Sequence, residues 1–217
     1  GNIKFDYRPP DGTEALGRAW RERNAPGRPV WVAGSTHEGE EAIVLDAPRR
    51  VLQKVPDALL VLVPRHPQRF EAVRELLTKR RERFVNRSAR TAVPPSTPVL
   101  LGDTMGELMT FYAAADVAFV AGSLVPIGGH NLLEPASVGC PVLTGPHNFN
   151  GEEIARLLMD AGAAFVVADT AQLAHAVIGL LEVADMREVM AKAGKAVLDA
   201  NRGALDRLLT LVDPLLD

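Results

Sequence analysis

The sequence is poor in cysteine, in aromatic residues and in long apolar runs, and it has no excess of either charge. Cys140 is the one cysteine among 217 residues, so an internal disulfide and a thiolate metal cage are both excluded. The 24 basic and 27 acidic residues leave a formal charge of -3, without the basic footprint of a nucleic-acid-binding domain. No run approaches the roughly 18 apolar residues that cross a bilayer. Because 47% of residues are hydrophobic, we expect a soluble, globular chain. The single cysteine fits a reducing compartment.

Short apolar runs alternate with helix-like patterns along the chain. Since none of these runs alternates polar and apolar residues, they indicate strands buried on both faces of a parallel sheet. The sequence predicts an α/β fold: a single doubly wound, Rossmann-like domain with a six-stranded parallel sheet. The strands are expected at residues 30–33, 59–63, 99–101, 117–120, 142–144 and 164–167, with helices between them at 39–50, 68–80, 106–115, 132–138 and 152–161.

The chain divides into three predicted parts. Residues 1–29 form a linker and first helix, residues 30–169 the Rossmann-like core, and residues 170–217 a helical tail with helices at 170–183, 185–200 and 203–211. One charge run, KRRERFVNRSAR at residues 79–90, is interpreted as a solvated helix end and surface loop in preference to a contact with anionic lipid.

The loops after the strands hold the residues suited to chemistry, because ligands of open parallel sheets bind at the carboxyl ends of strands. After the first strand, Gly34 and Gly39 have P-loop spacing, but Glu40 and Glu41 stand where a P-loop needs Lys and Ser or Thr. Together with the missing G-x-G-x-x-G pattern, this excludes a nucleoside triphosphatase and disfavours a nicotinamide dehydrogenase. Ser35, Thr36 and His37 remain as hydroxyl and imidazole donors for a ligand, and the alternative is that Ser35 or Thr36 is the N-cap of the next helix.

The loop AGSLVPIGGHNLLEP is the most informative one. Gly128 and Gly129 allow a phosphate or sugar close to their backbone, and Asn131 is expected to open a helix whose free amides bind an anion. Glu134, in the first turn of that helix, suits the adjacent hydroxyls of a ribose. The alternative is a capping box, in which Asn131 and Glu134 bind each other's backbone amides.

Arg65 and His66 lie between Pro64 and Pro67, directly after a strand. The prolines restrict this turn, and the Arg65 guanidinium suits a phosphate or carboxylate, although an ion pair with a helix carboxylate is the alternative. No metal site is predicted, because the histidines lack ligand spacing and no Asp-x-Asp pair is present.

At these loops the chain resembles the 3-deoxy-D-manno-octulosonic acid (Kdo) transferases of lipopolysaccharide biosynthesis. The matching strings, in order, are GNIKFD, GSTHEGEE, PRHPQRF, GDTMGEL, FVAGSL, GGHNLLEP and GPHNFN. The resemblance implies the C-terminal, donor-binding half of a GT-B glycosyltransferase. The full protein would transfer Kdo from CMP-Kdo to a lipid A precursor with inversion and without metal or cofactor, at the cytoplasmic face of the inner membrane. No catalytic residue is expected in this chain, because the resemblance implies a carboxylate base in an N-terminal acceptor domain.

The same resemblance assigns residues to the donor. It implies that CMP contacts Arg65, Met105 and Gly106, with the phosphate at Gly128 and Gly129 and the ribose at Asn131 and Glu134. Ser35, Thr36, His66 and His130 would line the cleft toward the sugar. Gly151 departs from the pattern, where a bulky residue is expected after Asn-Phe-Asn.

Two alternatives of other classes remain at this point. The chain is either half of a GT-B transferase or epimerase that uses a uridine diphosphate sugar, or a binding module that holds a nucleotide without turning it over. For the preferred interpretation we expect the chain to fold alone but to transfer no sugar.

Overall fold

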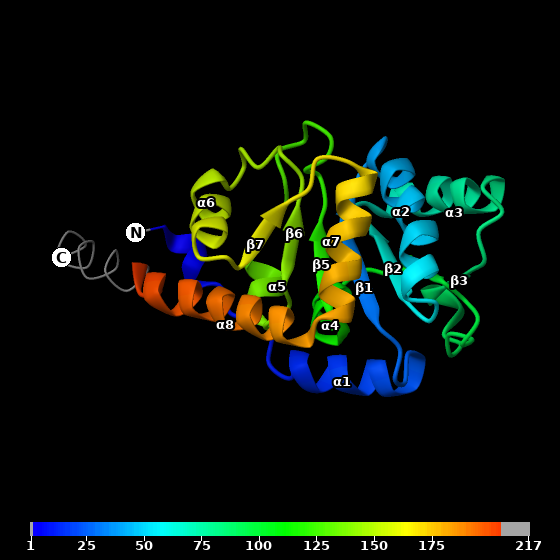
Figure 1. Ribbon diagram of the computed structural model, residues 1–217, viewed down its shortest axis with the longest axis horizontal. Helices are drawn as coiled ribbons and strands as arrows, with labels where there is room; N and C mark the ends of the chain where they lie inside the picture. The colour runs from blue at the N-terminus through cyan, green and yellow to red at the C-terminus, as the bar shows by residue number, and fades with distance from the viewer. Residues whose placement is uncertain (1, 205–217) are drawn as a thin grey trace, which may run out of the picture.

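A computed structural model describes residues 2–204 as one parallel sheet between two helical layers (Figure 1). The sheet has seven strands in the order β3-β4-β2-β1-β5-β6-β7, and every neighbouring pair is parallel. The strands are β1 Val30–Thr36, β2 Leu59–Pro64, β3 Phe84–Asn86, β4 Val99–Leu101, β5 Val117–Val120, β6 Val142–Thr144 and β7 Ala164–Val166. This confirms the α/β, Rossmann-like prediction.

Helices cover both faces of the sheet. The α-helices are α1 Thr13–Asn24, α2 Glu40–Lys54, α3 Phe70–Lys79, α4 Leu108–Ala114, α5 Leu133–Ser137, α6 Glu152–Asp160, α7 Thr170–Glu182 and α8 Ala184–Asn201, with short 3-10 helices η1 Ile3–Asp6, η2 Pro67–Arg69 and η3 Arg87–Ala89. One core joins α1, α4, α5, α6 and the end of α8 to one face, and a second joins α2, α3 and α7 to the other.

The strand sequences explain both cores. Along β1, Val30 and Val32 belong to the first core, whereas Trp31 and Ala33 belong to the second. Successive side chains of a strand point to opposite faces, so a strand covered on both sides is apolar throughout. All seven residues of β1 are buried, as the absence of polar alternation predicted.

The prediction of six strands is wrong by one, because β3 lies inside the charge run at residues 79–90. Phe84 pairs with Val99 at the sheet edge, and the strand has only three half-buried residues. Charged residues and a short length are usual at sheet edges, where they discourage pairing with other chains. The interpretation of this run as helix end and loop therefore holds only on either side of β3.

The order of the strands creates one switch point. From β1 the chain passes to β2, β3 and β4 on one side, and then crosses to β5, β6 and β7 on the other. The neighbouring strands β1 and β5 are therefore followed by loops that run to opposite sides of the sheet. Open α/β sheets bind ligands in the crevice between two such loops.

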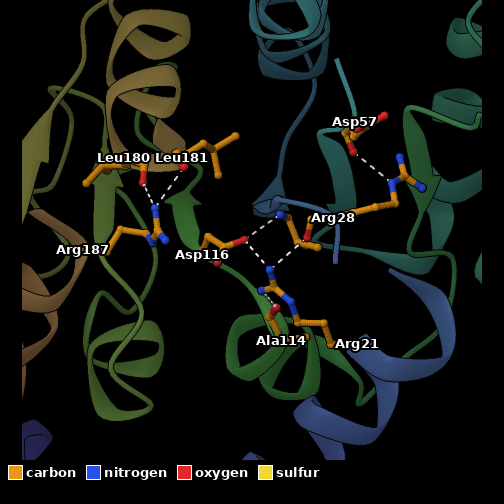
Figure 2. Close-up of polar contacts among 9 residues, drawn as sticks. Arg21, Arg28, Asp57, Ala114, Asp116, Leu180, Leu181 and Arg187 are labelled. Carbon is orange, nitrogen blue, oxygen red and sulfur yellow. Dashed lines mark hydrogen bonds and ion pairs between the residues drawn. The ribbon is translucent and has the colours of Figure 1, made fainter. Parts of the chain in front are cut away.

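At the amino ends of the strands, opposite the switch point, a polar network joins β1 to β5 (Figure 2). One carboxylate oxygen of Asp116 accepts hydrogen bonds from the Val30 amide and from Arg21, both at 2.8 Å, and so ties the start of β1 to the start of β5. Arg21 also donates to the carbonyls of Ala114 and Arg28. The two strands that flank the switch point are thereby fixed at their far ends.

The predicted helical tail is observed as α7 and α8. The helix predicted at 203–211 lies almost wholly outside the described residues. Near the end of the described residues, the Gly203 amide donates a hydrogen bond to the Asp6 carboxylate at 2.6 Å, so the two ends of the described chain meet. Within residues 2–204, no helix combines the length and apolar character needed to cross a membrane.

Candidate functional site

The end of β1 carries a local distortion at Ser35. This residue has a left-handed backbone (φ 60), and the pairing of β1 with β2 shifts register between Gly34 and Thr36. Such conformations are costly for residues other than glycine and concentrate at functional sites. The N-cap alternative for Ser35 and Thr36 is wrong, because α2 begins at Glu40 with Gly39 as its N-cap. Ser35 is nearly buried, and the Thr36 hydroxyl is fully buried without a partner among the described residues.

Glu40 joins the loop after β1 to the loop after β5. Its fully buried carboxylate accepts hydrogen bonds from the amides of Gly122, Ser123 and Leu124 at 2.7, 3.1 and 2.9 Å. The sequence analysis used this residue only to exclude a P-loop. It gave no signal for the clamp, because the three amides lie more than 80 residues away.

Three histidines meet at the switch point, although their spacing in the sequence did not predict it. The Nε2 atoms of His37 and His130 are 2.7 Å apart, with rings nearly parallel and centroids 5.0 Å apart. The His66 ring meets that of His37 edge to face at 5.6 Å. Gly122 permits this packing, since a Cβ at this position, whose φ is 71, would lie 2.9 Å from the His130 ring. The sequence offered His37 as a possible ligand donor, but His37 was not among the residues assigned to CMP-Kdo.

Burial and, to a smaller extent, the nearby His37, Arg65 and His66 together lower the pKa of His130 to about 4. The pKa of His37 is also lowered, chiefly by burial and against the opposing effect of Glu40. The pair is therefore uncharged at neutral pH, and the hydrogen bond between the two Nε2 atoms holds one proton.

Arg65 leaves its guanidinium available to an anion. The residue is exposed, and within residues 2–204 it forms no ion pair, so the predicted alternative of an ion pair with a helix carboxylate is not observed. The neighbouring Arg69, by contrast, pairs with Glu38 at 3.4 Å and Glu41 at 3.2 Å. The turn that carries Arg65 is tied to β1 by a hydrogen bond from its amide to the Thr36 carbonyl.

Residues 128–131, here called the GGHN loop, line a cavity of about 380 Å³. Its walls come from the loop after β5, the loop after β6 and the N-terminal segment, and its lining residues are Lys4, Gly128, Gly129, His130, Asn131, Leu132, Asn148, Asn150, Gly151 and Ile154. The backbone amides of Gly128, His130 and Asn131 have no acceptor within the described part of the chain. Unpaired amides beside a cavity suit an anionic oxygen.

Packing also explains the two glycines. A Cβ on Gly128 would lie 2.4 Å from the Phe149 ring, and one on Gly129 would lie 2.7 Å from the Asn148 side chain. Both residues have a positive φ. The loop after β6 thus occupies the side of each glycine where a side chain would stand, and phosphate approach is not needed to account for them.

Helix α5 differs from the helix predicted here. It begins at Leu133 and has five residues. Asn131 accepts a hydrogen bond from the Leu133 amide at 3.1 Å, but no bond between the Glu134 carboxylate and a backbone amide occurs in residues 2–204. Neither bond of the predicted capping box is therefore formed, because the side chain of Asn131 binds the amide of Leu133 in place of that of Glu134. Burial raises the pKa of Glu134, while the charge of Arg65 and the amide of Asn131 lower it in part.

Met105 and Gly106 lie apart from the GGHN loop. Met105 is 59% exposed and lines a second cavity of about 500 Å³ with Arg23, Arg87, Arg90, Thr104 and Glu107. Since this loop follows β4, three strand spacings separate it from the loop after β5, or about 14 Å. The predicted donor residues thus extend across the carboxyl ends of four neighbouring strands, from β4 to β5.

Gly151 has open space around it and borders the first cavity. A larger residue at this position would fill part of that space without a clash. In the part of the chain that is described, no group of three or more His, Cys, Asp or Glu side chains is arranged to hold a metal ion.

Comparison with known proteins assigns this geometry to a family. The sequence profile of Glycosyl transferases group 1 matches residues 29–197. The chain belongs to this family. The match covers the whole sheet and most of α8, so the loops on both sides of the switch point lie inside the glycosyltransferase domain.

Relatives within this glycosyltransferase family confirm the resemblance to Kdo transferases. The chain is 46% identical over its whole length to the 3-deoxy-D-manno-octulosonic acid transferase of Haemophilus influenzae and covers 51% of that protein. The Bordetella pertussis protein of the same name is 39% identical over 98% of the chain, which covers 50% of that relative. The chain thus spans about half the length of these curated relatives.

A solved structure matches the chain along nearly its full length. The C-terminal CMP-Kdo binding domain of WaaA from Acinetobacter baumannii is 32% identical, with a TM-score of 0.78, over 91% of this chain and 99% of that one. The glycosyltransferase domain described here thus has the fold of a donor-binding half.

Proposed function

We propose that the chain binds CMP-Kdo and is the donor-binding half of a Kdo transferase in lipopolysaccharide biosynthesis. The observation that carries this proposal is the likeness to the CMP-Kdo binding domain of WaaA along almost the whole of both chains. The two relatives that bear the name of the transferase support the same reaction.

The cavity and the Arg65 turn suggest how the donor lies. The unpaired amides of the GGHN loop suit the phosphate of CMP, and the free guanidinium of Arg65 suits the phosphate or the Kdo carboxylate. Asn131 and Glu134 take the ribose, and Met105 with Gly106 takes the base. Because these residues extend across three strand spacings, the donor lies along the edge of the sheet.

The remaining predicted residues line the side of the sugar. We assign Ser35, Thr36, His66 and His130 to the cleft that holds Kdo. Ser35 and Thr36 are nearly or fully buried, so they act on the sugar through the shape of the strained turn or after a small opening of it.

In the proposed reaction an acceptor hydroxyl of a lipid A precursor attacks the anomeric carbon of Kdo from the face opposite CMP. The carbon–oxygen bond to the phosphate breaks, its electrons stay with CMP, and a carboxylate of an N-terminal acceptor domain takes the hydroxyl proton. No metal is required, because Arg65 and the nearby amides supply positive electrostatic potential at the phosphate. For the full-length enzyme, with its lipid acceptor, we propose a location at the cytoplasmic face of the inner membrane.

Calorimetric titration of the chain with CMP, CMP-Kdo, UMP and UDP tests this proposal. We expect CMP and CMP-Kdo to bind and UMP to bind more weakly, since the base differs. Tighter binding of UDP than of CMP would replace the donor with a uridine diphosphate sugar. Absence of binding by all four nucleotides would remove the donor role from this domain.

A further inference from the structure

We infer that His37 and His130 act as one proton-sharing unit that takes up a proton when a phosphate anion binds in the neighbouring cavity. The inference rests on the proposed function and adds His37 to the donor site. It starts from the 2.7 Å contact between the two Nε2 atoms.

A hydrogen bond between two Nε2 atoms restricts the tautomers of both rings. If His37 carries the shared proton, its Nδ1 is an acceptor and the Nδ1 of His130 carries a proton; if His130 carries it, the roles reverse. The pair therefore presents one donor and one acceptor in either state. A second proton converts it into a cation whose two Nδ1 atoms both donate.

The surroundings keep the second proton off the unliganded pair. His66 and Arg65 approach from the end of β2, and Arg69 from η2 adds positive charge near His37. The acidic residue acting on His37 is Glu40, whose carboxylate is already bonded to three amides. Burial of the two rings, which has the larger effect, and these neighbouring positive charges both favour the neutral pair.

The acidic neighbours outside this group are neutralised by other partners. Glu38 and Glu41 pair with Arg69, and Glu134 lies near enough to Arg65 for its pKa to respond to that cation. Lys4 faces the cavity from the N-terminal segment. None of these carboxylates is bonded to the ring of His37 or His130, so within residues 2–204 a second proton on the pair has no direct carboxylate partner.

A phosphate in the cavity supplies a compensating negative charge. His130 belongs both to the pair and to the cavity wall, next to the unpaired amides of Gly128 and Asn131. An opposite charge within hydrogen-bonding reach favours the protonated form of an imidazole, and the shared hydrogen bond spreads this effect to His37.

Proton uptake has a consequence for the proposed reaction. The CMP that leaves carries one more negative charge than the phosphodiester in CMP-Kdo, once its second ionisation, with a pKa of about 6, is complete. A unit that gains a proton beside this phosphate interacts more strongly with the leaving group than with the intact donor. Such a difference lowers the barrier to transfer.

Nuclear magnetic resonance of the histidine rings tests the inference on the 217-residue chain. In the free protein we expect His37 and His130 to titrate together, with opposite tautomers at neutral pH. Saturating CMP is expected to raise their shared midpoint by about 1–3 pH units, and cytidine, which lacks the phosphate, to leave it in place. The monoanionic methyl ester of CMP is expected to raise it less. His175 on α7 is the internal control, because it lies outside the cluster.

A variant separates a proton-sharing role from simple packing. Between the midpoints of the free and the CMP-bound pair, uptake of one proton makes the affinity of the unaltered chain for CMP fall about tenfold per pH unit as the pH rises, and His37→Gln is expected to lose this decrease. His175→Gln is expected to keep that decrease. The wild-type titration decides the question even if His37→Gln does not fold.

The possible outcomes distinguish this inference from the proposed function. If CMP binds without moving the midpoint of the pair, the inference is overturned and the donor role stands. If CMP does not bind, inorganic phosphate becomes the probe: a raised midpoint keeps the inference while the donor role fails. If neither CMP nor inorganic phosphate raises the midpoint of the pair, the inference is overturned.

Discussion

Arg65 places a cation at the carboxyl edge of the sheet without a described carboxylate to pair with it. We therefore predict that Arg65→Ala weakens CMP binding by about 1.5–3 kcal/mol, the range for hydrogen bonds to charged groups. The melting temperature is expected to stay nearly constant, because the side chain is exposed. Calorimetry and thermal melting of the same sample measure both quantities.

Arg156→Ala is the matched control for Arg65. Arg156 is an exposed arginine on α6 that pairs with Asp160 one helical turn away. Its loss is expected to change neither CMP affinity nor stability measurably, since exposed pairs contribute little. A large fall in melting temperature for Arg65→Ala, with unchanged affinity, would show that Arg65 serves the fold.

Glu134 permits a second test at the scale of one residue. Its carboxylate lacks the backbone partner of a capping box, so we predict that Glu134→Gln weakens CMP binding more than it lowers stability. The analogue 2',3'-dideoxy-CMP lacks both hydroxyls and is expected to bind the variant and the unaltered chain equally. The double difference between residue and ribose isolates their interaction. Equal losses for both nucleotides would remove Glu134 from the ribose site.

At the scale of elements, Glu40 binds the start of α2 to the loop after β5 through three amides. We predict that Glu40→Gln lowers the free energy of unfolding by about 3 kcal/mol, because the amide removes the charge and turns a donor toward backbone donors. Urea denaturation measures the change. Glu38→Gln, two residues earlier and 86% exposed in its side chain, is the control and is expected to shift the midpoint little.

The elements also mark how far the sequence could be read. Six strands were predictable from their apolar runs, and five of them are buried; β7 is an edge strand on which Phe165 and Val166 are exposed, contrary to the expectation of burial on both faces. The strand β3 was not predictable, because an edge strand of three half-buried residues among arginines has no such pattern. The glycines of the GGHN loop were predictable as special positions. The clamp by Glu40 and the contact of His37 with His130 were not, since both join residues more than 80 positions apart.

At the scale of the whole molecule, the neutral histidine pair links stability to pH. The folded pKa of His130 is about 4, below its unfolded value of 6.5. Between these values the unfolded chain binds the proton and the folded chain does not, so we predict that stability falls as pH falls from about 6.5 to about 4. His130→Gln is expected to lose less stability than the unaltered chain over this window, as measured by urea denaturation at several pH values.

His175→Gln provides the reference for that comparison. Carboxylates also titrate at low pH, so only the difference between variants isolates the contribution of His130. If His130→Gln and His175→Gln follow the same curve as the unaltered chain, the pair is not the source of the pH dependence.

The final prediction concerns the activity of the chain by itself, which we expect to bind CMP-Kdo without transferring Kdo. Transfer needs a group that takes the proton of the acceptor hydroxyl. Near the proposed donor site, the carboxylates of residues 2–204 are engaged: Glu40 holds three amides, Glu38 and Glu41 pair with Arg69, and Glu134 lies in the field of Arg65.

Mass spectrometry of a lipid A precursor incubated with CMP-Kdo and the purified 217-residue chain tests this expectation. No mass increase by one Kdo is expected, while the full-length Haemophilus influenzae relative, 46% identical over this chain, serves as the active control. Adding the N-terminal half of that relative tests whether a second domain supplies the base, and renewed transfer would support it. Transfer by the chain alone would contradict the division of roles, and Glu134→Gln would then show whether that carboxylate is the base.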